Sequence, residues 1–191
     1  MSRQALVKLL SMGLALAAAL PMAGCIDDDV GRLSGALLVV RGCEAGQDVI
    51  FEPYDMFGNF FALEQLGDVA FIRMQNGGKP LHRSDAFVVE VAGTEFIRNR
   101  LGIAIPIDNP KIRASLSVLG SCPGTSQAMT AHEGSITFHE FGASSGERVR
   151  AEFAFQLLDD RTGEVVGLGF SGEMDFEVKV GKPYQPFSGT Q

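Results

Sequence analysis

The 191-residue sequence contains no tryptophan, no cluster of basic residues and no apolar run long enough to cross a membrane. An apolar segment at residues 9–20 has about a dozen residues, whereas a transmembrane helix needs about 20. The net charge is −7, which argues against nucleic acid as a partner and against broad attraction to anionic lipid. Without tryptophan, the chain also lacks the buried indole that is typical of immunoglobulin domains.

Motifs of nucleophilic and nucleotide chemistry are missing as well. The segment G-T-S-Q-A at 124–128 lacks the second glycine of a nucleophile elbow. Gly167, Gly169 and Gly172 match part of a G-x-G-x-x-G dinucleotide motif, but no helical pattern follows them. We expect Gly167 and Gly169 to mark a bulge or a close approach of two backbones. The sequence therefore predicts no catalytic residue and no cofactor.

Histidine is scarce, and its spacing does not favour a metal site. The three histidines are His82, His132 and His139, of which the last two lie in H-E-G-S-I-T-F-H-E. Residues seven apart in a strand project from opposite faces, so these two would converge only if Gly134 turned the chain sharply. We predict no metal site, with His139 on the solvent-exposed face of a strand and His132 in the loop before it.

The first 25 residues carry the clearest signal in the chain. Two basic residues among the first eight precede the apolar segment 9–20, the order found in a secretory signal peptide. The small residues Ala23 and Gly24 then precede Cys25. This arrangement resembles the lipobox of bacterial lipoproteins, which implies that residues 1–24 are removed and that Cys25 becomes a lipidated first residue. The alternative is an ordinary secretory signal with an incidental cysteine.

The same resemblance implies where the protein is held. The lipid on Cys25 would attach the chain to a membrane of the bacterial cell envelope, and two or more acyl chains anchor a protein stably in a bilayer. Ile26 follows the cysteine, which by the rule for enteric bacteria implies the outer membrane, at its periplasmic or surface face. Residues 27–29 are three aspartates. We expect residues 25–33 to form an acidic tether, and a surface-export signal is the alternative for the aspartate run.

The remaining two cysteines form an even pair. Once Cys25 is assigned to lipid, Cys43 and Cys122 are left in an oxidising compartment, where disulfides persist. Each follows an apolar, strand-like run, and no neighbouring residue would activate a thiol. We predict a disulfide between Cys43 and Cys122.

The mature chain alternates apolar and polar residues with the period of a β-strand. Residues 170–180 place Phe170, Met174 and Phe176 on one face and acids on the other, including Glu173. Residues 149–157 alternate in the same way, and the two segments predict an antiparallel hairpin. Further strand-like runs with glycine-rich breaks predict a mainly β fold, a single antiparallel β-sandwich, with an open or closed β-barrel as the alternative.

The coarse organisation follows from these strands. We expect one β-sandwich domain over residues 34–182 and a flexible tail over 183–191, since Pro183 and Pro186 lie in a polar C-terminus. Short helical turns are expected at 57–66 and 94–101. Acids such as Glu173 on the solvent-exposed faces of strands are expected to be solvated charges rather than a carboxylate pair of a glycosidase.

One aromatic stretch is the candidate binding loop. Residues 51–61 contain Tyr54, Phe57, Phe60 and Phe61 within a few positions of one another. Most should lie in the core, and an aromatic loop that binds an apolar ligand or an envelope protein is the alternative. The sequence thus favours a lipid-anchored, non-enzymatic binding or structural module. The alternatives are a small periplasmic enzyme with an unidentified site and a barrel-type carrier of apolar molecules.

Overall fold

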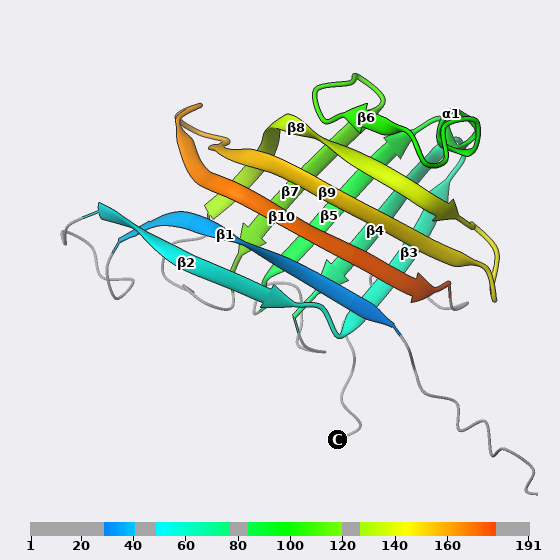
Figure 1. Ribbon diagram of the computed structural model, residues 1–191, viewed down its shortest axis with the longest axis horizontal. Coiled ribbons are helices and arrows are strands. Elements are labelled where there is room, and N and C mark those ends of the chain that lie inside the picture. Colours follow the sequence, from blue (N-terminus) through cyan, green and yellow to red (C-terminus); the bar gives the residue numbers. More distant parts are fainter. Residues whose placement is uncertain (1–28, 41–48, 77–83, 120–126, 179–191) are drawn as a thin grey trace, which may run out of the picture.

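The computed structural model describes residues 29–40, 49–76, 84–119 and 127–178 of the chain, which form one antiparallel β-sheet and one short helix (Figure 1). The elements are β1 (Val30–Val40), β2 (Val49–Phe57), β3 (Phe60–Leu66), β4 (Val69–Gln75), β5 (Ala86–Ala92), α1 (Thr94–Arg98), β6 (Ala104–Pro106), β7 (Ile112–Val118), β8 (Gln127–Phe141), β9 (Arg148–Asp159) and β10 (Val165–Glu177). The predicted mainly β, antiparallel fold is confirmed.

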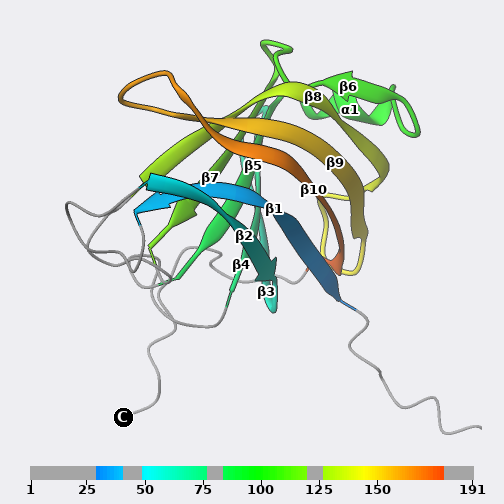
Figure 2. The same cartoon turned by 60° about the vertical axis from the view of Figure 1, so that its left-hand side comes forward.

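The sheet curls into a half-barrel (Figure 2). Its strand order is β2-β1-β10-β9-β8-β7-β5-β4-β3, and β6 pairs separately with β8. The first and last strands, β2 and β3, are consecutive in sequence and are joined by Gly58 and Asn59. The Gly58 N–H donates to the carbonyl of Gly31 at 2.9 Å, and the Asn59 N–H to that of Gln75 at 3.1 Å. The two layers of the predicted sandwich are therefore two halves of one curled sheet, which corresponds to the open-barrel alternative.

The inner face of the curl is filled by the apolar side chains that the alternation predicts. Along β9, every second residue from Val149 to Leu157 is buried. Phe87 of β5 packs against Phe153 and Phe155 of β9, with ring centroids 4.7 and 5.4 Å apart. Phe155 also stacks on Phe170 of β10 at 6.1 Å. These ring contacts join β5 to β9 and β10 across the inside of the curl.

The predicted β9–β10 hairpin is confirmed, and its glycines behave as expected. The register between the two strands shifts on both sides of Gly167. A Cβ atom at Gly167 would lie only 2.7 Å from the Cβ of Leu157, and Gly169 has φ of +60°. The glycine-rich segment is therefore an irregular part of a strand pair, since side chains crowd Gly167 and the backbone of Gly169 is left-handed.

Two sequence-based boundaries differ from the structure. Residues 57–66, expected as helical turns, contain the strand β3, because pairing with β4 satisfies the backbone of this segment. Strand β1 begins at Val30, so residues 30–33 belong to the sheet rather than to the expected acidic tether; Leu33 is fully buried. The short helix expected at 94–101 is confirmed as α1. The tail at 183–191 lies outside the described residues.

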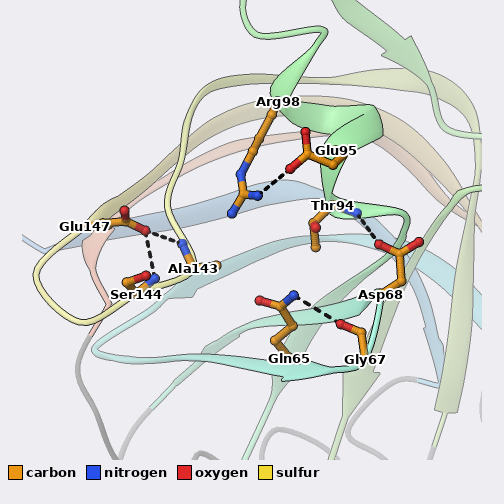
Figure 3. Close-up of polar contacts among 9 residues, drawn as sticks. All are labelled: Gln65, Gly67, Asp68, Thr94, Glu95, Arg98, Ala143, Ser144 and Glu147. Atoms are coloured by element: carbon orange, nitrogen blue, oxygen red, sulfur yellow. Dashed lines mark hydrogen bonds and ion pairs between the residues drawn. The ribbon is translucent and has the colours of Figure 1, made fainter.

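Polar side chains fix the connections around α1 (Figure 3). The Asp68 carboxylate accepts the backbone N–H of Thr94 at 3.2 Å. Glu147 accepts the backbone N–H groups of Ala143 and Ser144, both at 2.7 Å, in the connection between β8 and β9. These hydrogen bonds, first that from Ser144, lower the pKa of the Glu147 carboxyl. The connection is thereby held between the end of β8 and the start of β9.

Candidate functional site

A polar groove on the outer face of the half-barrel is the candidate site. It has a volume of about 530 Å³ and crosses four neighbouring strands, β1, β10, β9 and β8. We call it the outer groove; its lining residues are Arg32, Ser34, Ser135, Thr137, Glu152, Phe153, Ala154, Ser171, Gly172 and Glu173. Most of these side chains are polar, in contrast to the apolar inner face.

The floor of the outer groove is a row of small residues in register. Ser34 of β1 pairs with Ser171 of β10, which pairs with Ala154 of β9, which pairs with Ser135 of β8. Residues directly opposite one another on antiparallel strands have their Cβ atoms about 5 Å apart. Four short side chains side by side therefore leave a hollow across the sheet, with hydroxyl groups that can donate and accept hydrogen bonds.

A second row, one pleat along, forms a charged ridge. Arg32, Glu173, Glu152 and Thr137 are paired across the same four strands. Glu173 and Glu152 are direct neighbours, an arrangement of like charges that is unfavourable by itself. Arg32 donates to Glu173 at 2.8 Å, and the Nε2 of His139 lies 3.4 Å from Glu152. Glu173 thus contacts Arg32 on its β1 side, and Glu152 contacts His139 on its β8 side.

A smaller hollow of about 290 Å³ lies on the other side of this ridge. Glu152 and Glu173 line both hollows, and His139, Arg150 and Asp175 line the smaller one. Arg150 pairs with Glu140 at 3.3 Å, and Asp175 accepts two hydrogen bonds from Arg148. The hydrogen bonds to Asp175 raise the pKa of Arg148. The outer face of these strands therefore presents alternating charges with partly exposed side chains.

The predicted aromatic stretch is two strands joined by a two-residue corner rather than a loop. Phe57 is exposed at the end of β2. Phe61 of β3 stacks on Phe176 of β10 with ring centroids 5.0 Å apart. The guanidinium carbon of Arg73 lies 5.8 Å from the ring centroid of Phe60. The stretch therefore divides between core packing at Phe61 and exposure at Phe57.

Tyr54 connects two distant parts of the sheet on the inner side of the half-barrel. Its ring lies 6.0 Å from that of Phe170, and its hydroxyl donates to Oδ2 of Asp85 at 2.9 Å. Asp85 is 3% exposed and directly precedes β5. Burial, and then the negative charge of Asp85, raise the pKa of Tyr54. This hydrogen bond joins β2, at one edge of the sheet, to β5 near the other edge.

The histidines do not come together in the described part of the chain. His132 and His139 both lie in β8, so His132 is not in the loop that the sequence suggested. Each has its own glutamate, Glu133 at 3.8 Å for His132 and Glu152 for His139. Among the described residues, no three His, Cys, Asp or Glu side chains are grouped as metal ligands would be. His82 lies outside the described residues.

The three cysteines also lie outside the described residues. Cys25, the predicted lipidation site, precedes β1 by five positions. Cys43 follows the last residue of β1, Val40, and Cys122 follows the last residue of β7, Val118. Within the described segments there is no helix of the length and apolarity that a membrane crossing needs.

Comparison with known proteins finds no family model, no curated protein and no solved structure that matches this chain.

Sequence reasoning did not identify the outer groove. The alternation of β10 correctly places Ser171 and Glu173 on the solvent-exposed face, but it does not reveal their neighbours. Ser34 and Ser171 are far apart in the chain, and only the register of β1 against β10 makes them adjacent. Small residues on the exposed faces of several predicted strands were the one available signal.

Proposed function

We propose that this protein is a lipid-anchored module of the bacterial cell envelope that binds a polar partner through the outer groove. The lipid is attached at Cys25, and residues 1–24 are removed. Delivery is to the outer membrane. Cys43 and Cys122 form a disulfide. The partner is an envelope protein or another polar envelope component, and no catalysis is required of the module.

The observation that carries the binding role is the registered row of Ser34, Ser171, Ala154 and Ser135. A concave surface with convergent hydroxyl and charged groups fits a ligand that is recognised by hydrogen bonds. The Glu152 and Glu173 side chains on its ridge are 65% and 50% exposed. General acids are normally shielded from water, so these carboxylates suit binding better than proton transfer.

The packing of the interior favours this role over a carrier of apolar molecules. A carrier needs a hollow core. In the half-barrel, Phe87, Phe153 and Phe155 are 1%, 4% and 4% exposed and contact one another. Aromatic rings thus occupy the centre of the curl, where an apolar ligand would have to lie.

The tethering is tested by Cys25→Ser. We expect the wild-type protein to incorporate labelled palmitate and to partition into the detergent phase, and the variant to do neither. A variant that still enters the detergent phase would show that the anchor is not at Cys25.

The binding role is tested by filling the groove. Ser171→Arg places a large side chain in the middle of the small-residue row, whereas Glu164→Arg adds the same side chain at an exposed position between β9 and β10. Both variants and the wild type are used to capture partners from solubilised envelope. We expect a component that is retained by the wild type and Glu164→Arg and lost with Ser171→Arg. Equal retention by all three would exclude the outer groove.

A further inference from the structure

An exposed apolar pair lies where the chain enters the sheet. Val30 is the first residue of β1 and is 46% exposed, and Phe57 is the last residue of β2 and is 63% exposed. Phe57 pairs with Arg32, two positions from Val30, so the two apolar side chains are diagonal neighbours on the outer face. Diagonal neighbours are within reach of an aromatic ring, so Val30 and Phe57 form one small surface.

Backbone hydrogen bonds hold this pair at a fixed place. The Gly58 N–H, directly after Phe57, donates to the carbonyl of Gly31, directly after Val30, at 2.9 Å. The Glu177 N–H donates to Oδ1 of Asp29 at 2.8 Å. The apolar pair and the point where the chain enters the sheet therefore move together with the sheet.

The distance from this pair to the predicted lipid is short. Val30, the first residue of β1, follows Cys25 by five positions, and an extended chain spans at most about 3.6 Å per residue, or about 18 Å in total. If Cys25 carries a lipid, the start of β1 cannot lie farther than this from the membrane surface. The tether is thus too short to let the domain rotate freely above the bilayer.

The chemistry of the pair suits the interface of a bilayer. Aromatic and aliphatic side chains gain by leaving water at the level of the headgroups. The charged residues beside the pair form ion pairs, since Arg32 binds Glu173 at 2.8 Å and Arg148 binds Asp175 at 2.6 Å. With these charges paired, the surface has no excess positive charge to attract anionic lipid, so it fits a zwitterionic bilayer.

We infer that Val30 and Phe57 form a docking surface for a zwitterionic bilayer and hold the half-barrel against the membrane. This inference rests on the proposed lipidation of Cys25 and adds an orientation to it. The alternating face of β1 continues from Val30 through Arg32 to Ser34, so the outer groove opens beside the bilayer rather than far from it.

Single-tryptophan variants test the docking, since the chain has no tryptophan of its own. Phe57→Trp probes the surface. Phe51→Trp is the matched control, because Phe51 is 44% exposed on the same face of β2 and lies about 20 Å along the strand, at about 3.3 Å per residue. The lipidated variants are reconstituted into phosphatidylethanolamine and phosphatidylcholine vesicles with brominated acyl chains. We expect quenching at position 57 to be at least twofold that at position 51.

Flotation of the same samples distinguishes a failure of the lipid anchor at Cys25 from a failure of the docking surface. If the protein floats with the vesicles and the two positions are quenched equally or not at all, the anchor stands and the docking surface is wrong. If the protein with Cys25 intact stays in the aqueous fraction, the lipid assignment fails, and the docking fails with it. Quenching that is stronger at position 51 would place another part of β2 at the membrane and would also overturn the inference.

Discussion

At the scale of single residues, Tyr54 and Asp85 form the contact that most directly joins distant parts of the fold. Asp85 is buried and Tyr54 is partly buried, and the Tyr54 hydroxyl donates to the Asp85 carboxylate. A buried acceptor that loses a donor costs more free energy than an exposed one, because water does not replace the donor. The hydrogen bond also depends on the tyrosine keeping its proton.

We predict that Tyr54→Phe lowers the free energy of unfolding by about 1 to 2 kcal/mol, because it removes one hydrogen bond to the buried Asp85 and keeps the ring against Phe170. Urea unfolding followed by circular dichroism measures the change. Phe51→Leu, at an exposed position, is the control and should change stability by less than about 0.5 kcal/mol. Equal effects of the two substitutions would show that the hydrogen bond is not stabilising.

Alkaline pH should act on the same residue. The pKa of Tyr54 is raised in the folded protein, while in the unfolded chain it is about 10. The resulting stabilisation is complete below about pH 10 and is lost as the pH rises above it, because only the unfolded chain releases the proton. We expect stability to fall between pH 9 and pH 11 more steeply for the wild type than for Tyr54→Phe. Parallel curves would contradict this assignment.

At the scale of elements, β8 pairs with three other strands and contributes a bulge that shapes the outer face. Its first part pairs with β7 and its later part with β6, while β9 runs along its other side. The change of partner coincides with a register shift between His132 and Gly134, where Glu133 and Gly134 both have positive φ. This bulge redirects β8 and brings Ser135 into the row of small residues.

We predict that Gly134→Ala destabilises the fold by more than about 2 kcal/mol. Gly134 has φ of +118°, and a Cβ atom there would overlap the carbonyl oxygen of Ala154. Gly163→Ala is the matched control. Gly163 also has a positive φ, of +72°, but there is open space around it, so the cost should be about 1 kcal/mol. Thermal unfolding compares the two, and similar losses would show that crowding at the bulge is unimportant.

At the scale of the whole molecule, the direction of the strands bears on the predicted disulfide. Four successive antiparallel pairings lead from β1 through β10, β9 and β8 to β7. An even number of reversals means that β1 and β7 run in the same direction. Cys43 follows the end of β1 by three positions and Cys122 follows the end of β7 by four, and the bond between them stays a prediction.

We predict that the exported protein contains a bond between Cys43 and Cys122, and that replacing both by serine lowers stability under oxidising conditions. Closing the loop of about 80 residues between these cysteines stabilises the folded state by about 4 kcal/mol in the chain-entropy model, and often by less. Mass spectrometry of non-reduced peptides identifies the bond. Reduction of the wild type should produce the same loss of stability as the double substitution, and two free thiols in the exported protein would refute the pairing.

The sequence by itself determined which face of each long strand is buried. In β9 and β10, Phe153 and Met174 point inward because alternation is a local property of the extended backbone. The irregularity at Gly167 was also evident, because a glycine inside a strand pattern has a local cause. The lipid at Cys25 is likewise a prediction from local sequence, and it awaits the palmitate experiment.

Only the tertiary structure decided how those faces meet. Nothing local to Ser34 specifies that it lies beside Ser171, or that Tyr54 reaches Asp85 across the interior. Strand order and register are set by pairing between segments distant in sequence and by the packing of one shared core, and each segment alone is compatible with many partners. The alternation therefore predicted a β fold, whereas the two-residue corner at Gly58 and the outer groove follow from the assembled sheet.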